Sequence, residues 1–162
     1  NERNILEVIR KNGFNVPTFC YRPDLTKDFG ACRMCVVEID GRMIQASCTT
    51  PPAEGMVVKT STPAVIEARR IVLDLILSNH DRECLTCTRN GNCELQRLAQ
   101  AFYVDDIKYK GERNVHEIDD LSPAIVRDFN KCVLCRSASR LYFSRMEIDD
   151  AILDREMLTK FA

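Results

Sequence analysis

The sequence predicts an α+β fold organised in three consecutive segments, residues 1–58, 59–105 and 106–162. Three observations support this prediction. The alternating residues Val36–Ile39, followed directly by Asp40-Gly41, are typical of an antiparallel hairpin. Apolar residues at helical spacing after Thr62-Pro63 are typical of an amphipathic helix. The nine cysteines also fall into three groups, one in each segment.

The first segment is expected to contain one short helix and a small sheet. Ile5–Arg10 has the pattern of a helix, and the Asn-Gly pair that follows is a typical helix end, since glycine tolerates the left-handed backbone there. Val36–Ile39 and Arg42–Ala46 are the predicted strands of the hairpin. Met56–Lys59 is predicted to form a further short strand.

The second segment is expected to be helical. A helix over residues 62–79 would bury a stripe of apolar side chains and carry His80 at its C-terminal end. A second helix is expected from about Cys93 to Phe102, and Ser122-Pro123 predicts a further helix start in the third segment. The stripe consists of Val65, Ala68, Val72, Leu75 and Ile76.

The composition argues against several classes of function. The chain has 162 residues and a net charge of −1, so its charge balance does not indicate a nucleic-acid partner. It has no run of about 18 apolar residues, so no membrane span is expected. The first residues lack the pattern of a secretory signal peptide, and a cytoplasmic location is expected. No phosphate-binding loop, nucleophile elbow or acid/base pair is found, so no catalytic site is expected within this chain.

The cysteines are better explained as metal ligands than as disulfides. Their number is odd, and no secretion signal is recognisable. Two cysteines three residues apart converge readily on one metal centre, and in a reducing compartment such pairs are usually ligands or redox-active. The chain has three such pairs: Cys32/Cys35, Cys84/Cys87 and Cys132/Cys135.

The first group has the spacing of a four-thiolate centre. A 2Fe–2S cluster takes four thiolates, which one close pair and two more distant cysteines can supply. Gly30-Ala31 are small, so that backbone N–H groups can approach the cluster sulfides. A structural zinc site remains an alternative on spacing alone, although such sites usually contain two close pairs. The members of the group are Cys20, Cys32, Cys35 and Cys48.

The second group combines one histidine with three cysteines. Such a set suits a tetrahedral zinc ion or a 4Fe–4S cluster, and the spacing does not separate the two. Imidazole in place of a thiolate removes one negative charge, so it is expected to raise the reduction potential of a cluster. The members are His80, Cys84, Cys87 and Cys93.

Cys132 and Cys135 form an incomplete third group. A ferredoxin-type site requires another cysteine three residues later, but Ala138 occupies that position and no cysteine follows. The pair is compatible with a partial cluster site, a redox disulfide or two inert thiols. The other histidine, His116, has no cysteine near it and is expected on the surface.

Two sets of motifs resemble one family of iron–sulfur proteins. Phe19–Tyr21, Gly30–Glu38 and Ala46–Pro51 resemble the N-terminal 2Fe–2S ferredoxin domain of that family. The family comprises iron-only (FeFe) hydrogenases, the large iron–sulfur subunit of complex I and the diaphorase-side subunit of NAD-linked nickel–iron hydrogenases. Ser78–Cys87 and Asn90–Gln96 resemble the 4Fe–4S domain that follows, which takes one histidine and three cysteine ligands. The motif Leu85–Gln96 resembles the FeFe hydrogenases and their NADH-linked relatives more than it resembles complex I.

The resemblance implies two cofactors, a 2Fe–2S cluster and a 4Fe–4S cluster. Residues 1–58 would form a β-grasp 2Fe–2S domain without its first hairpin, and residues 59–105 a small helical 4Fe–4S domain. Residues 106–162 would be a linker, a partial 4Fe–4S ferredoxin-like segment and a divergent tail, because the resemblance ends near Arg136. The H-cluster domain of the hydrogenases is absent, so the chain is expected to be truncated.

The implied function is an iron–sulfur electron-transfer module or subunit, which relays electrons to or from an FeFe hydrogenase or an NADH-linked hydrogenase complex. Its implied partners are the hydrogenase catalytic part, a flavin-containing NADH-oxidising subunit and ferredoxin. One alternative is the electron-relay part of another NAD(P)-linked oxidoreductase, such as a formate dehydrogenase or a complex I relative. Another, from a different class, is a zinc-stabilised binding module.

Overall fold

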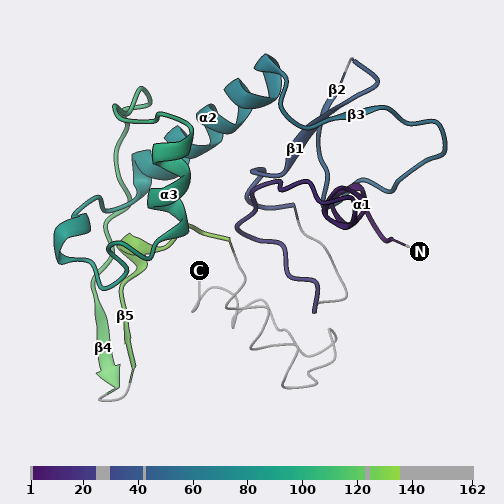
Figure 1. The fold of residues 1–162 in the computed structure, drawn as a ribbon. Helices are drawn as coiled ribbons and strands as arrows, with labels where there is room; N and C mark the ends of the chain where they lie inside the picture. Colours follow the sequence, from purple (N-terminus) through teal and green to yellow (C-terminus); the bar gives the residue numbers. More distant parts are fainter. Residues whose placement is uncertain (1, 25–29, 42, 123–124, 136–162) are drawn as a thin grey trace.

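A computed structural model describes residues 2–24, 30–41, 43–122 and 125–135 of the chain. A small sheet with one short helix occupies one end, and the long helix α2 leads from it to a mainly helical end (Figure 1). Within the described residues, no helix combines the length and the apolar character that crossing a membrane requires. The elements are α1 (Ile5–Lys11), β1 (Val36–Ile39), β2 (Met43–Ala46), β3 (Val58–Lys59), α2 (Pro63–Asn79), η1 (Cys84–Thr86), α3 (Glu94–Ala101), β4 (Asp119–Ser122), β5 (Ile125–Arg127) and η2 (Phe129–Lys131).

Helix α1 packs against the small sheet. Asn4 caps its first turn, because the Asn4 side-chain oxygen accepts a hydrogen bond from the Glu7 N–H at 3.0 Å. Ile5, Leu6 and Ile9 are buried and share one apolar cluster with residues of β1 and β2. The predicted short helix is confirmed and extends one residue further than expected.

The sheet has three antiparallel strands in the order β2-β1-β3. At the hairpin end of β1, Ile39 lies opposite Met43 of β2 and Val58 of β3. Asp40 (φ 51°) and Gly41 (φ 69°) follow β1 in the left-handed region, which Asp and Gly tolerate best. The predicted hairpin is confirmed, and the third strand is shorter than expected.

Helix α2 begins as the sequence predicts. The Thr62 hydroxyl oxygen accepts a hydrogen bond from the Val65 N–H at 3.4 Å, and a proline occupies the first helical position. Val65, Arg69 and Leu73 lie four residues apart and are buried, whereas Leu75 is 51% exposed. The row of Val65, Arg69 and Leu73 faces the rest of the fold. The prediction that Leu75 belongs to the buried stripe is therefore wrong.

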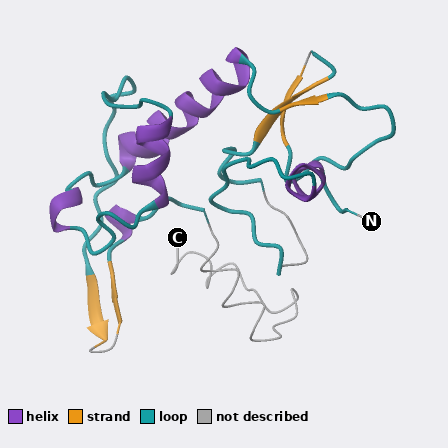
Figure 2. Ribbon diagram, in the orientation of Figure 1, coloured by secondary structure: helices purple, strands orange, loops and turns teal. Residues whose placement is uncertain are grey.

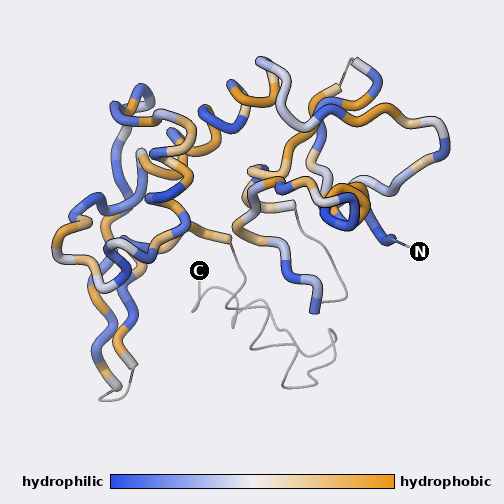
Figure 3. Tube along the Cα trace, viewed as in Figure 1, coloured by the Kyte–Doolittle hydropathy of each residue, from blue (hydrophilic) through white to orange (hydrophobic). Residues whose placement is uncertain are grey.

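A second apolar cluster joins the two ends of the molecule. Helix α2 runs from the sheet to α3 (Figure 2), and apolar and hydrophilic residues alternate along both helices (Figure 3). Such alternation is typical of helices with one buried face. The buried members of this second cluster are Cys20, Cys32, Met34, Leu73, Leu95 and Leu98. The first segment therefore contributes side chains to the core of the second.

The third segment contains a hairpin where the sequence predicts a helix. Asp119 of β4 lies opposite Arg127 of β5, with an ion pair of 3.0 Å between their side chains, and Ser122 lies opposite Ile125. The prediction of a helix cap at Ser122 is wrong, since this residue ends a strand. Pro123 lies outside the described residues. A proline after a polar residue is common in turns as well as at helix starts, so the sequence signal was ambiguous.

Candidate metal centres

The four cysteines of the first group meet where the hairpin joins the neighbouring loops. Cys32 and Cys35 lie in the loop that enters β1, and Cys48 follows β2. Ser47 holds the two sides together, because its N–H and its hydroxyl both donate to the Cys35 carbonyl, at 3.2 and 2.7 Å. Cys20 comes from the non-helical segment after α1. Strand pairing thus brings together cysteines that are distant in the sequence.

All four thiols are buried, and hydrogen bonds connect them. Bonds from the Cys32 and Cys48 thiols lower the pKa of Cys20 to about 2. A bond from Cys48 lowers the pKa of Cys35 to about 6. The pKa values of Cys32 and Cys48 are raised, chiefly because both donate to Cys20. Cys20 and Cys35 therefore favour the thiolate form, which is the form that binds metal ions.

Backbone N–H groups also point toward these sulfurs. The Phe19 N–H donates to Cys32 Sγ at 3.4 Å. A hydrogen bond from the Ala31 N–H helps to lower the pKa of Cys20. Gly30 has φ 57°, and a Cβ at this position would lie 2.9 Å from Thr49 Cγ2, so the tight loop requires glycine. Four buried sulfurs with adjacent N–H donors fit a 2Fe–2S cluster, whose negative charge such donors stabilise.

The second group lies on the connection between α2 and α3. His80 is the C-cap of α2, Cys84 begins η1, Cys87 is the C-cap of η1, and Cys93 is the N-cap of α3. Cys84 is exposed, whereas the other two thiols are partly buried. In the part of the chain that the structure describes, no three His, Cys, Asp or Glu side chains converge as they would on a single metal ion. A cluster does not require such convergence, because its irons divide the protein ligands among them.

His80 is chemically suited to bind a metal. Its Nδ1 is buried and has no hydrogen-bond partner among the described residues. Burial lowers the pKa of His80, so the imidazole is neutral at pH 7, which is the form that binds metals. A buried nitrogen without a partner is costly, and a metal bond would remove that cost. The orphan nitrogen and the three thiols together fit a histidine-ligated cluster.

Gln96 shapes the loop that carries the last cysteine of the second group. Its side-chain oxygen accepts from the Gly91 N–H and its side-chain nitrogen donates to Asn90 Oδ1, both at 3.1 Å. Gly91 has φ 75°, a left-handed backbone that glycine adopts readily in turns. On the other side of the loop, the Arg89 N–H donates to Cys87 Sγ at 3.4 Å. One residue of α3 therefore fixes the turn that precedes Cys93.

The third pair lies beside the second group. The Asp81 N–H donates to the Asn130 carbonyl at 2.8 Å, so the segment before Cys132 is attached next to His80. Cys132 is exposed, and its Sγ accepts from the Leu134 N–H at 3.4 Å. Cys135 is partly buried against the second apolar cluster. Ala138 and the predicted tail lie outside the described residues, and His116 is exposed as expected.

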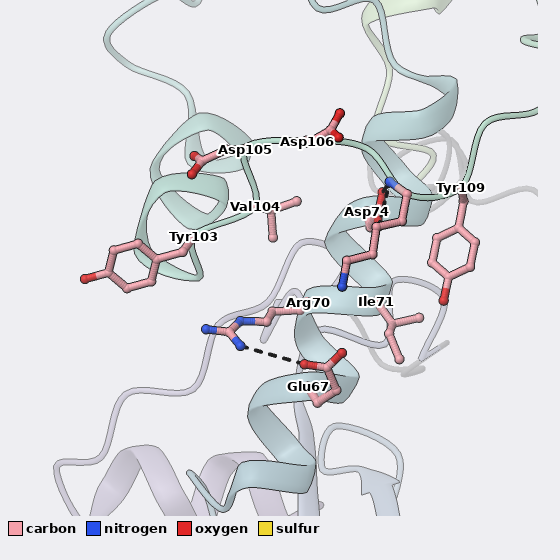
Figure 4. A pocket seen from close by; sticks show the side chains of 10 residues that line it. Glu67, Arg70, Ile71, Asp74, Tyr103, Val104, Asp105, Asp106 and Tyr109 are labelled. Atoms are coloured by element: carbon pink, nitrogen blue, oxygen red, sulfur yellow. Dashed lines mark hydrogen bonds and ion pairs between the residues drawn. The ribbon is translucent and has the colours of Figure 1, made fainter.

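A pocket of about 260 Å³ lies between α2 and the segment that follows α3 (Figure 4). In this pocket the Arg70 side chain points toward Glu67, with 3.7 Å between the Arg70 nitrogen and the Glu67 oxygen. Its lining residues are Glu67, Arg70, Ile71, Asp74, Tyr103, Val104, Asp105, Asp106, Lys108 and Tyr109. Because the lining contains no cysteine or histidine, the pocket belongs to neither candidate centre.

Two buried residues near the first centre were missed by the sequence analysis. Met34, between Cys32 and Cys35, is fully buried and belongs to the second apolar cluster. Arg69 is 5% exposed and donates to the Val36 carbonyl at 2.7 Å. The only sequence signal for Arg69 was its position four residues after the apolar Val65 and four before the apolar Leu73.

Comparison with known families matches two iron–sulfur regions in this chain. A family profile described as "2Fe-2S iron-sulfur cluster binding domain" matches residues 1–63. A profile described as "NADH-ubiquinone oxidoreductase-G iron-sulfur binding region" matches residues 69–108. The chain carries a 2Fe–2S domain and a 4Fe–4S region. The predicted cofactors and their order along the chain are confirmed.

Several relatives and solved structures match most of this chain. The NADP-reducing hydrogenase subunit HndD of Solidesulfovibrio fructosivorans is 41% identical over 137 residues, which is 82% of this chain and 23% of that protein. An NADH-quinone oxidoreductase subunit of Rhizobium meliloti (strain 1021) is 38% identical over 140 residues, or 85% of this chain and 16% of that protein. In a crystal structure of NAD⁺-reducing [NiFe]-hydrogenase in the H₂-reduced state, one chain superposes with a TM-score of 0.81 at 31% identity, covering 88% of this chain and 60% of that one. The chain thus spans less than a quarter of the length of either curated relative.

Proposed function

We propose that the chain relays single electrons between a 2Fe–2S cluster and a 4Fe–4S cluster within an NAD(P)-linked hydrogenase. The second apolar cluster carries this proposal, because residues of both ligand groups belong to it. Cys20 and Cys32 of the first group are among its buried members, and Cys93 of the second packs against it. Protein interiors of this kind are close-packed, so continuous packed atoms connect the two centres.

The proposed ligands divide between the two centres. When bound, the clusters supply one-electron redox chemistry, and the chain holds them, excludes water and tunes their potentials. The buried thiols with their N–H donors support the first set, and the orphan Nδ1 supports His80 in the second. The 2Fe–2S ligands are Cys20, Cys32, Cys35 and Cys48, and the 4Fe–4S ligands are His80, Cys84, Cys87 and Cys93.

The proposed domain limits follow the same division. Residues 1–58 form a β-grasp 2Fe–2S domain, residues 59–105 hold the 4Fe–4S cluster, and residues 106–162 contain a partial ferredoxin-like segment. The three-stranded sheet covered by α1 supports the first assignment. Cys132 and Cys135 are the start of a further cluster site, which other residues must complete. Their position beside His80 is consistent with a third centre that follows the second.

The proposed assignment to a hydrogenase includes the FeFe hydrogenases. A specific observation also supports one alternative, a complex I relative. The resemblance of the Leu85–Gln96 motif to FeFe hydrogenases and the 41% identity to a NADP-reducing hydrogenase subunit favour a hydrogenase. The 38% identity to a NADH-quinone oxidoreductase subunit favours a complex I relative instead. Both assignments make the chain an electron relay, with a flavin-containing NADH-oxidising subunit among the partners.

Metal analysis with EPR on the anaerobically purified chain tests the relay. We expect about six irons per chain, two plus four, together with acid-labile sulfide. Cys20→Ala should remove only the 2Fe–2S signal, and Cys87→Ala only the 4Fe–4S signal. A colourless protein that contains zinc would refute the proposal. Iron well above about six would indicate that Cys132 and Cys135 also hold a cluster.

Reduction by hydrogen separates the two assignments. In the native complex that contains the full-length chain, H₂ should reduce both clusters if the complex is a hydrogenase. In a complex I relative, NADH should reduce them and H₂ should not. The EPR spectrum under each reductant decides between the two.

A further inference from the structure

Arg69 is a buried cation at the boundary between the sheet and helix α2. Its side chain is 5% exposed, although it lies on a helix whose opposite face is solvated. One terminal nitrogen donates to the Val36 carbonyl at 2.7 Å, and Nε is buried without a partner among the described residues. Arginine stays protonated in proteins, so a full positive charge is held out of water at this position.

No carboxylate compensates for this charge among the residues that the structure describes. Asp74, the other buried charged residue of α2, accepts from the Lys108 backbone N–H with both oxygens, at 3.1 and 3.2 Å. A buried charge without a counter-ion is strongly unfavourable, so a fold that keeps one normally provides an anion.

The carbonyl that Arg69 binds lies next to the first centre. Val36, which accepts the Arg69 hydrogen bond, directly follows Cys35 in the chain. Burial lowers the pKa of the Arg69 guanidinium, and the Cys35 thiolate is the charged group that opposes this effect. A 2Fe–2S cluster with four thiolates is anionic and gains one more negative charge on reduction. The buried cation therefore lies where negative charge increases in the redox reaction.

We infer that Arg69 is the electrostatic counter-ion of the 2Fe–2S centre and raises its reduction potential. The inference rests on the proposed function, because it requires a 2Fe–2S cluster on the first group of cysteines. Arg69 acts through its charge and is not a ligand. Since it belongs to α2, the helix that leads to the 4Fe–4S region controls the potential of the neighbouring cluster. Arg69 thereby changes the difference between the reduction potentials of the two clusters, which drives the electron transfer.

The adjacent residue provides a matched control. Arg70 lies on the same helix with the same charge, but it faces the pocket of Figure 4 and is partly exposed. Its Nε donates to the Phe102 carbonyl at 2.9 Å, and Glu67 partly neutralises it. Removing the Arg70 charge should change the reduction potential of the first centre little, because solvent and Glu67 already screen that charge.

The test is a redox titration of both clusters by EPR in the holoprotein and in four variants. Arg69→Met and Arg69→Gln remove the charge, Arg69→Lys keeps it, and Arg70→Met is the control. In the two neutral Arg69 variants, the reduced-to-oxidised ratio of the 2Fe–2S cluster at a fixed potential should fall about tenfold, or about 59 mV for a one-electron couple. The ratio should stay near the wild-type value in Arg69→Lys and Arg70→Met. The 4Fe–4S midpoint is the internal reference and should shift less.

Each outcome bears on the inference. A 2Fe–2S signal with an unchanged midpoint in Arg69→Met or Arg69→Gln would overturn it and leave the electron relay intact. If both neutral variants fail to load the cluster, Arg69→Lys decides: a wild-type midpoint supports the role of the charge, and a midpoint as low as about 59 mV below wild type refutes it. A wild-type protein without a 2Fe–2S signal would overturn both the relay and this inference.

Discussion

Truncation of Met34 to alanine should loosen the contact between the 2Fe–2S domain and the helices of the 4Fe–4S region. The Met34 side chain is fully buried in the cluster that also contains Leu73, Leu95 and Leu98. Replacement of a buried methionine by alanine typically costs about 2 to 5 kcal/mol, because it removes apolar contacts and leaves a cavity. That loss is a large fraction of the about 5 to 15 kcal/mol by which folded proteins are stable.

Anaerobic urea unfolding, followed by far-UV circular dichroism and by the visible absorbance of the clusters, measures this effect. With a slope of about 2 kcal/mol per molar urea, the Met34→Ala midpoint should fall by about 1 to 2.5 M. Met34→Leu conserves volume and should cost less than about 1.5 kcal/mol. A Met34→Ala midpoint equal to that of Met34→Leu would refute the role of Met34 in joining the two regions.

Three further predictions concern other parts of the chain. His80→Cys should retain the 4Fe–4S cluster but lower its potential in redox titration, because a thiolate adds negative charge; His116→Ala is the control, and equal midpoints would contradict His80 as ligand. Asn4→Ala should cost about 1 kcal/mol of stability through loss of the α1 cap, and Asn4→Ser should restore part of it in the same unfolding assay. The Arg3 N–H and, to a smaller extent, the Tyr21 hydroxyl lower the pKa of Glu7 to about 2. The ionised Glu7 side chain therefore stabilises the fold fully above pH 4.5, and this contribution is lost as the pH falls toward 2. Glu7→Gln should therefore lower Tm by the same amount throughout pH 5 to 8, and a loss that varies across this window would contradict the assignment.

The sequence by itself determined the local elements and the ligand types. Asp40-Gly41 marks the hairpin turn and Thr62 the start of α2, because turns and caps depend on neighbouring residues only. Cysteine spacing and motif resemblance also predicted both cofactors before any contact was known. The same local reasoning was wrong at Ser122, where the pairing of β4 with β5 decided the outcome.

Only the tertiary structure decided which side chains surround the centres. Cys20 and Cys48 reach Cys32 and Cys35 because strand pairing and loop packing bring distant segments together, which spacing cannot specify. A charged residue within a helix is expected in solvent, so the four-residue spacing from Val65 and Leu73 was too weak a signal to identify Arg69 as buried. Its burial follows from the packing of α2 against β1, and this packing places a buried cation beside the first centre.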